Sequence, residues 1–515
     1  MVGIIKRRQW ILASVIIAAV IFTSAVIIGC NPTANGISFG AVSDQQGGVM
    51  ALCQQGKQIY AQRMNDSGNL VWNNGGVLLN DRFTPAFLPW EQQINVVGDG
   101  QGGIIATWDD RSGLVNDAQD PSYFSSLPVY SQRLNANGIT MWGSAVPTGN
   151  TQAVGDSLTK PVSDEQGGAI FVYDDFQVVD EALHNDFFYL QKLNSAGIPQ
   201  WGTKGILVAS TAPFHPTTPQ EKSEGEKGTW TRDGPSYESF SIVSDTVGGV
   251  FVVWFERISA FDETVYAQHY SPDGKPQWTT TGIPIYEGSF ITSDYVAFDG
   301  MDGIFITISI NEGSSGGKLI AQRVSGEGDL LWSPNGVPLE ENINDLGSIQ
   351  MVPSGQGDLI IAWQEVYSGE KYTQGILQVV KLDSEGNTSW QKEPLPLTDP
   401  GNEISDLSLC NDDNSIFMSW RLSNIETHGL SGGTIMAARL DIGSGQIPWG
   451  GSVIKVFDNP DLKYQSSPQV VVDNAGGCII VPAVGRNSSE GDMVYAQRLD
   501  ANGNFLWNKG LKISQ

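Results

Sequence analysis

Acidic and aromatic residues gather in the long segments between the apolar runs of this chain, and their side chains are the ones best suited to ligand chemistry. Aromatic rings beside carboxylates can bind a glycan or a segment of protein. Charged residues also follow the apolar runs at Glu256, Arg257 and Glu365. The candidate ligand-binding residues are Trp90, Asp109, Asp110, Arg111, Tyr123, Phe124, Asp174, Asp175, Trp230 and Tyr237.

Recognised catalytic patterns are missing. The four histidines do not form a His-Glu-x-x-His pair, no cysteine pair has zinc-site spacing, and there is no Gly-x-Ser-x-Gly turn. The adjacent acids Asp109/Asp110 and Asp174/Asp175 leave one enzymatic alternative open, because paired carboxylates can cleave glycans. Adjacent aspartates are also common in solvated loops. We therefore expect no catalytic residue, no cofactor and no metal site, although the acidic surface would tolerate Ca²⁺.

The elements that position these residues come from a repeat. A stretch such as Tyr60-Ala61-Gln62-Arg63 is followed by a glycine and, four residues later, by a tryptophan. Eight such Gly/Trp pairs occur, at 68/72, 138/142, 197/201, 274/278, 328/332, 386/390, 445/449 and 503/507. Repeats of several tens of residues are typical of stacked supersecondary units.

Each repeat also has a first half, in which two apolar runs flank a turn such as Asp44-Gln45-Gln46-Gly47-Gly48. Asp folds back onto turn amides and Gly adopts positive φ, so this Asp is interpreted as a turn former. Each repeat is then four short strands with two tight hairpins. Eight units predict an all-β, eight-bladed β-propeller over residues 36–515, with four-stranded antiparallel blades. The Trp is expected to fill the wedge between blades, and the Gln to bond backbone between blades.

The Asp-x-x-Gly-Gly hairpin followed by Tyr-Ala-Gln-Arg…Gly…Trp resembles the repeats of bacterial secreted and surface propellers of the NHL and PQQ-like kind. The resemblance covers the mature chain and implies the propeller fold. PQQ-dependent dehydrogenases share eight blades with a Trp in each, but no residue of a cofactor pocket or metal site corresponds here. The sialidase Asp-box is absent as well.

The two hairpin turns of every repeat are expected on one face of the ring, called here the hairpin face. The remaining connections lie on the opposite face, called the loop face, and vary in length. Long ones are 81–92, 109–128, 174–186 and 210–240. Long loops in a compact array are often functional, so the ligand is expected on the loop face of the second to fourth blades. The ring closes by packing alone or through a pairing by residues 31–37.

The N-terminus is a targeting segment. Lys6, Arg7 and Arg8 precede an uncharged run over 10–29, and Ile27-Ile28-Gly29-Cys30 resembles a bacterial lipobox with Cys30 as the lipidated residue. The run is also long enough for an uncleaved membrane anchor. Residues 1–29 are thus a signal peptide or an anchor, and 30–35 a short linker. Either way the chain is expected on the extracytoplasmic side of a bacterial cell membrane.

Charge and cysteine usage narrow the partners. A net charge of −27 repels nucleic acid, so none is expected as a partner. Cys53, Cys410 and Cys478 remain after the lipobox; Cys53 and Cys478 are interpreted as core residues, with a disulfide between them as the alternative.

The leading hypothesis is a monomeric, non-catalytic surface protein that binds a protein or glycan partner. The alternative is a glycosidase or lyase with an acidic site at the channel mouth.

Overall fold

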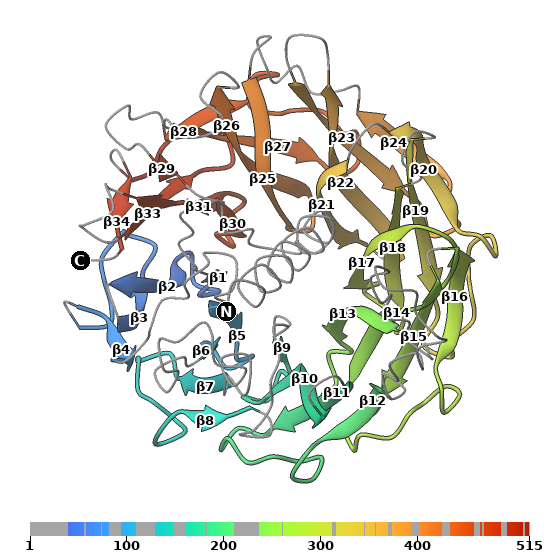
Figure 1. The fold of residues 1–515 in the computed structure, drawn as a ribbon. Coiled ribbons are helices and arrows are strands. Elements are labelled where there is room, and N and C mark those ends of the chain that lie inside the picture. Colours follow the sequence, from blue (N-terminus) through green and yellow to red (C-terminus); the bar gives the residue numbers. More distant parts are fainter. Residues whose placement is uncertain are drawn as a thin grey trace, which may run out of the picture.

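The computed structural model describes most of the ring-forming part of the chain. The described residues are 40–55, 58–73, 75–81, 94–109, 129–148, 161–180, 183–210, 236–259, 261–311, 316–343, 346–355, 357–368, 373–392, 402–424, 433–457, 464–465, 468–485, 492–507 and 510–513. Over these residues the protein is all-β, and its sheets form a ring of eight antiparallel blades around a central axis (Figure 1). The predicted eight-bladed β-propeller is confirmed.

The first four blades follow the chain in order. Their strands are β1 (Ala41–Ser43), β2 (Val49–Gln55), β3 (Gln58–Met64) and β4 (Val77–Asn80); β5 (Ile94–Gly98), β6 (Ile104–Asp109), β7 (Val129–Leu134) and β8 (Val146–Pro147); β9 (Val162–Ser163), β10 (Ala169–Asp180), β11 (Leu183–Leu193) and β12 (Ile206–Ser210); and β13 (Ser236–Ser244), β14 (Val250–Ser259), β15 (Asp262–Tyr270) and β16 (Ile283–Gly288).

The next three blades repeat the plan. Their strands are β17 (Ile291–Phe298), β18 (Ile304–Asn311), β19 (Gly317–Val324) and β20 (Val337–Ile343); β21 (Leu346–Ser354), β22 (Asp358–Ser368), β23 (Thr373–Leu382) and β24 (Thr388–Lys392); and β25 (Asn402–Asn411), β26 (Ser415–Asn424), β27 (Thr434–Asp441) and β28 (Ile454–Phe457). In every blade the first strand lies toward the centre of the ring (Figure 1).

The eighth blade is interrupted. It contains β29 (Tyr464–Gln465), β30 (Gln469–Val472), β31 (Cys478–Val481), β32 (Ala483–Gly485), β33 (Asp492–Leu499) and β34 (Leu511–Lys512). Because β33 pairs with both β31 and β32, these two segments are one second strand broken at Pro482. Proline has no N–H for the ladder, which explains the break.

The core lies between blades, because each blade is packed on both faces. In β14, Phe251, Val253 and Phe255 pack with residues of blade 5, such as Ile304. The alternate residues Val250, Val252 and Trp254 pack with residues of blade 3, such as Ile170. Successive side chains of a strand point to opposite faces. The second strands are therefore largely apolar on both faces, as the sequence indicated, with polar exceptions such as Thr107 and Glu365.

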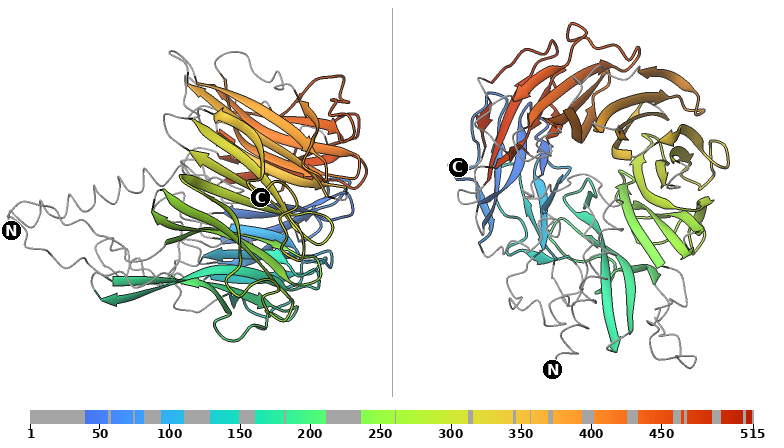
Figure 2. Two further views of the ribbon diagram at one scale, coloured as in Figure 1. Left: turned by 90° about the vertical axis from the view of Figure 1, so that its right-hand side faces the viewer. Right: turned by 45° about the horizontal axis from the view of Figure 1, so that its top comes forward.

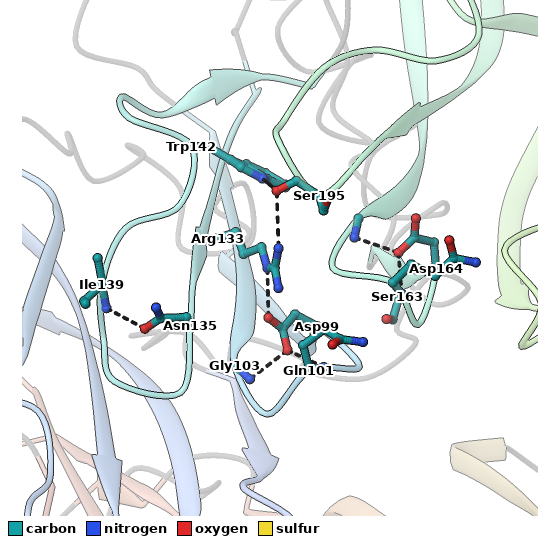
Figure 3. A network of polar contacts seen from close by, with 12 residues as sticks. Asp99, Gln101, Gly103, Arg133, Asn135, Ile139, Trp142, Ser163, Asp164 and Ser195 are labelled. Carbon is teal, nitrogen blue, oxygen red and sulfur yellow. Dashed lines mark hydrogen bonds and ion pairs between the residues drawn. The ribbon is translucent and has the colours of Figure 1, made fainter.

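The repeated residues form a structural network on the hairpin face (Figure 3). Asp99 Oδ1 accepts hydrogen bonds from the amides of Gln101 and Gly103 at 2.8 and 2.7 Å. Its Oδ2 accepts from Arg133 Nε at 2.8 Å. Arg133 Nη1 then donates to the carbonyl of Ser195 in the next blade at 3.2 Å. The recurring Asp is thus a turn former that also anchors an arginine.

The repeated Trp bridges neighbouring blades at all eight positions. Its Nε1 donates to a carbonyl in the third-to-fourth-strand turn of the following blade, as Trp142 does to Ser195 at 3.0 Å (Figure 3). The ring lies against the Gly of that same turn: a Cβ added at Gly197 would be 2.8 Å from Trp142 Cγ. The predicted wedge is confirmed. The repeated residues therefore hold the ring together.

The repeated Gln has a different role from the one expected. Gln62 Oε1 accepts from the amide of Trp72 at 3.1 Å, and Gln62 Nε2 donates to the carbonyl of Asn73 at 3.0 Å. Both partners belong to the same blade. The prediction that Gln bonds backbone between blades was wrong: a side chain in the third strand reaches the returning fourth strand of its own hairpin more directly.

Candidate functional site

Most of the predicted site lies outside the described residues. This applies to Trp90, Asp110, Arg111, Tyr123, Phe124 and Trp230, and also to the predicted lipidation residue Cys30. Asp109 is described as the last residue of β6, paired with Val129 of β7. Tyr237 lies in β13 and is half-buried.

Asp174 and Asp175 lie within a strand, which corrects the prediction that residues 174–186 form a loop. They occupy consecutive positions of β10, opposite Phe188 and Phe187 of β11. The aromatic and β-branched residues that follow them favour strand pairing. The β10–β11 hairpin consequently extends beyond the ring (Figure 2, left). Glu256 and Arg257, predicted to follow a strand, likewise lie inside β14, and Glu365 lies inside β22.

Tyr237 belongs to a row of polar residues that crosses blade 4 near the loop face. Tyr237 is paired with Glu256, Glu256 with Thr264, and Thr264 with Glu287, one from each strand of the blade. We call these four residues the carboxylate row. Tyr237, Glu256 and Thr264 are half-buried and Glu287 is exposed, so the row is open to solvent.

An aromatic layer lies next to the carboxylate row on the same face of blade 4. Phe240, Trp254 and Tyr266 come from three strands of blade 4, and their rings are nearly parallel, with centroid separations of 6.3 and 5.8 Å between successive rings. Phe188 of β11 stacks on Phe240 at 4.1 Å, so the layer continues into blade 3. Stacked rings of this kind are rigid, because each has few rotamers. They hold this face of blade 4 in a fixed position.

Partial burial and neighbouring negative charges shift the pKa values of Glu256 and Tyr237 in the carboxylate row. Burial raises the pKa of the Glu256 carboxyl, and the nearby Asp262 raises it further. Burial also raises the pKa of Tyr237 and of Tyr266, and the Glu256 charge adds to both shifts. The two phenols therefore stay protonated as neutral donors around neutral pH. The row and the adjoining aromatic layer together offer an acceptor carboxylate, Glu256, close to two phenol donors.

The cation next to this row is already engaged on the other face of β14. Arg257 forms an ion pair with the buried Glu263 through its Nε, and its Nη2 donates to the carbonyl of Ile291 at 3.2 Å. Glu263 also accepts from the amide of Ile291, the first residue of blade 5. Arg257 and Glu263 thus join blades 4 and 5. They are structural and leave the carboxylate row acidic.

Glu365 of blade 6 is also structural. It is 2% exposed and accepts a hydrogen bond from Trp363 Nε1 at 3.0 Å. Burial raises the pKa of the neighbouring Glu340 on β20, and the charge of Glu365 raises it further. Glu365 is buried in contact with an indole, so it is not accessible to a ligand. Glu365 and Glu340 are therefore a weaker candidate site than the carboxylate row.

Sequence reasoning missed a second polar row, between blades 2 and 3. Asn95, Thr107 and Ser131 are paired across β5, β6 and β7. Their Nδ2, Oγ1 and Oγ atoms are buried and have no hydrogen-bond partner in the protein. The signal in Thr107 itself is weak, because the equivalent residues Leu52 and Val253 are apolar but Thr307 and Ser419 of other repeats are polar. Such buried polar groups usually bind ordered water.

Three further findings concern metals, membranes and cysteines. Among the described residues, no group of three or more His, Cys, Asp or Glu could hold a metal ion. No described helix is long and apolar enough to cross a membrane. Cys53 and Cys478 are buried, free thiols that pack in different hydrophobic clusters, so the disulfide alternative is wrong and their assignment as core residues is confirmed.

Comparison with known proteins finds similar solved structures at low sequence identity. No protein-family model matches the sequence, and no curated protein matches it significantly. Among solved structures, prolyl oligopeptidase B from Galerina marginata matches with a TM-score of 0.45 and 11% identity, over 90% of this chain and 55% of that one. An ulvan lyase matches with a TM-score of 0.37 and 11% identity, over 76% and 92%.

A thermostable family-43 glycoside hydrolase also matches, with a TM-score of 0.30 and 12% identity, over 55% of this chain and 96% of that one. These three structural neighbours are enzymes. None reaches a TM-score of 0.5, so no residue role in this chain follows from them.

Proposed function

We propose that this protein is a membrane-anchored, extracytoplasmic propeller that binds a glycan at the carboxylate row of blade 4. The observation that carries the proposal is Glu256, a half-buried carboxylate opposite Tyr237 in the sheet and next to the phenol of Tyr266. Tyr237 and Glu256 come from the residues that the sequence singled out. Tyr266 belongs to the repeat, which places it at a fixed height in the blade.

The chemistry of the row fits a polyhydroxylated ligand. Sugar hydroxyls donate to carboxylates and accept from phenols, and sugar rings pack their apolar faces on aromatic side chains. Glu256 offers the acceptor, and the half-buried Tyr237 and Tyr266 offer the phenols and the aromatic surface, next to the buried rings of Phe240 and Trp254. Ligand sites commonly combine apolar walls with a few polar groups that fix orientation. A protein segment is the other partner class, and binding to glycans or to peptides separates the two.

The location rests on the N-terminal sequence and on the repeats. The basic residues Lys6–Arg8, the uncharged run over 10–29 and the lipobox-like Cys30 support export and anchoring. The similarity of the repeats to bacterial secreted and surface propellers of the NHL and PQQ-like kind supports the same compartment. A glycan partner is abundant on that side of a bacterial membrane.

The test is binding of the full-length protein, held in detergent, to a panel of immobilised glycans and peptides. We expect a glycan to bind, and Glu256→Gln to weaken it by about tenfold or more, because a hydrogen bond to a charged group contributes about 1.5–3 kcal/mol. Tyr237→Phe should weaken it less. Glu327→Gln, at an exposed site on the hairpin face, is the matched control. Binding of peptides alone, or a Glu256→Gln protein with full affinity, would refute the proposal.

Glycan cleavage is the second candidate, and one observation favours it. A carboxyl whose pKa is raised by burial stays protonated nearer to neutral pH, as a general acid requires, and Glu256 has this property. Asp262 and Glu287 would be the available second carboxylates. Release of shorter products from a bound glycan, abolished by Glu256→Gln at saturating glycan, would favour an enzyme. An unchanged glycan after prolonged incubation would leave binding as the function.

A further inference from the structure

Three apolar side chains are exposed together on the loop face of blade 4. Ile258 and Phe261, at the β14–β15 turn, are 64% and 74% exposed, and Phe290, between blades 4 and 5, is 36% exposed. The rings of Phe261 and Phe290 meet edge to face at 5.2 Å. We call these three residues the apolar tip. Exposed apolar clusters of this kind often mark a contact surface.

The protein holds the apolar tip in place. Phe290 has a φ of +60°, a conformation that bulky residues rarely adopt, and its carbonyl accepts from the amide of Asn311 at 3.0 Å. The Oγ of Ser289 donates to the carbonyl of Phe261 at 3.1 Å and connects the two segments. Backbone strain of this kind persists only where the surroundings fix it, and it is concentrated at functional sites.

The chain enters the ring on the face that carries the tip. Strand β1 runs from Ala41 toward the turn at Asp44, which is on the hairpin face, so residue 40 lies on the loop face. The uncharged run over 10–29 is only ten residues away in sequence. A fully extended segment of that length spans at most about 36 Å. A bilayer that holds the N-terminal run or a lipid on Cys30 is therefore close to the loop face.

We propose that the apolar tip inserts into the interface of the same bilayer that anchors the N-terminus, an inference that rests on the anchoring part of the proposed function. Aromatic and aliphatic side chains partition into the boundary between headgroups and acyl chains. Asp262 and Glu287 are exposed beside the tip, and the net charge is −27. Anionic lipid would repel this surface, so the partner is a zwitterionic bilayer.

Membrane contact also orients the ring. The loop face turns toward the bilayer, and the turns of the hairpin face point away. The carboxylate row lies on the same blade as the tip, since Ile258 follows Glu256 by two residues along β14. A glycan bound there would lie close to the membrane surface.

The experiment uses the full-length protein in zwitterionic phosphatidylcholine nanodiscs and in detergent. A Phe261→Cys variant is labelled with a membrane-impermeant maleimide, and Val247→Cys is the matched control, because Val247 is 66% exposed on the hairpin face of the same blade. The native Cys53 and Cys478 are buried, and the free, half-buried Cys410 is replaced by Ser in both variants. We expect labelling at position 261 to be about tenfold or more slower in nanodiscs than in detergent, and labelling at 247 to be equal in both.

Equal labelling rates at 261 in nanodiscs and detergent would overturn the inference while leaving the anchor intact, provided that the protein still co-purifies with the discs. Failure to co-purify would overturn both the anchor and the inference, and the glycan-binding result would be unaffected. If labelling at position 261 in detergent becomes slower as the protein concentration rises, a second copy of the protein covers the apolar tip. That result would also overturn the inference.

Discussion

The indole nitrogen of Trp507 lies 3.1 Å from the carbonyl oxygen of Asp66, and this hydrogen bond joins the last blade to the first. The Trp507 ring covers Gly68 of the same turn, and Arg498 Nη1 donates to the same carbonyl at 2.9 Å. All four strand positions of blade 8 come from the C-terminal part of the chain. Among the described residues the ring therefore closes with the Trp contact that joins every other pair of blades, without exchanging a strand.

Trp507→Ala should cost about 3–5 kcal/mol of unfolding free energy, as expected for a buried tryptophan that loses its contacts. Trp332→Ala removes an equivalent wedge between blades 5 and 6 and should cost about the same. Urea unfolding followed by circular dichroism measures both. A cost for Trp507→Ala far below that of Trp332→Ala would show that closure depends on something other than the wedge.

Gly138→Ala should destabilise the protein more than Gly143→Ala. Both glycines have positive φ, at 75° and 59°, so both variants gain about 1–2 kcal/mol of backbone strain. A Cβ at Gly138 would also lie 2.7 Å from Trp72 Cγ, whereas nothing lies within 4 Å of one at Gly143. Overpacking adds about 1–3 kcal/mol at Gly138. Equal losses in melting temperature for the two variants would contradict the close packing of Trp on Gly.

In blade 4, His269 occupies the position of the repeated arginine. We expect the stability of the protein at acidic pH to depend on this residue. Burial raises the pKa of Asp245, but hydrogen bonds from His269 and from the Val247 and Gly249 amides outweigh it and lower the pKa overall. A lowered folded pKa gives stability that is present above the unfolded value of about 3.9 and is lost as pH falls through the folded value.

His269→Phe keeps a ring on Phe251, which lies 4.1 Å from the His269 ring, but removes the hydrogen bond to Asp245. The folded pKa of Asp245 should then rise toward its unfolded value, so the variant should be less stable than the native protein at neutral pH and should lose less further stability as the pH falls. Melting temperatures measured between about pH 2 and 7 give the acid limb of the stability curve. Superimposable acid limbs for the two proteins would show that the His269–Asp245 contact does not stabilise the fold.

Thr107→Val should lower the melting temperature if ordered water fills the row of Asn95, Thr107 and Ser131, because the water loses a partner. Thr307→Val is the matched control in blade 5. Thr307 is also buried and has no partner, but its cross-strand neighbours are Tyr295 and Ala321, so replacing its hydroxyl should be neutral or stabilising. A rise in melting temperature for Thr107→Val would mean that the row is dry.

The fold could be predicted from the sequence because its determinants are local and repeated. The eight Gly/Trp pairs predicted eight blades, and the largely apolar second strands indicated burial on both faces. The role of Gln62 could not be read in this way, because Gln62 Nε2 bonds Asn73 across a hairpin whose geometry is set by packing. The extension of β10 through Asp174 depends equally on pairing with β11.

The candidate site was only partly predictable. The sequence selected Tyr237 as a loop aromatic and Glu256 as a charge near the loop face. Their pairing depends on an irregularity of β13 between Glu238 and Ser241, which shifts the register with β14. Without this β-bulge, Tyr237 would not lie opposite Glu256, since a shift of one residue turns a strand to its other face. Such a shift leaves no clear pattern in a single sequence.

Hydroxyl-radical footprinting of the full-length protein, with and without the glycan found by the panel, tests the central claim most directly. Tyr237 and Tyr266 are half-buried, and we predict that a saturating glycan lowers the oxidation rate of both by at least about threefold, because a bound ring excludes water from them. Phe505, 48% exposed on the hairpin face, should be oxidised at an unchanged rate. Unchanged oxidation of Tyr237 and Tyr266 at saturating glycan would contradict the placement of the ligand on the carboxylate row.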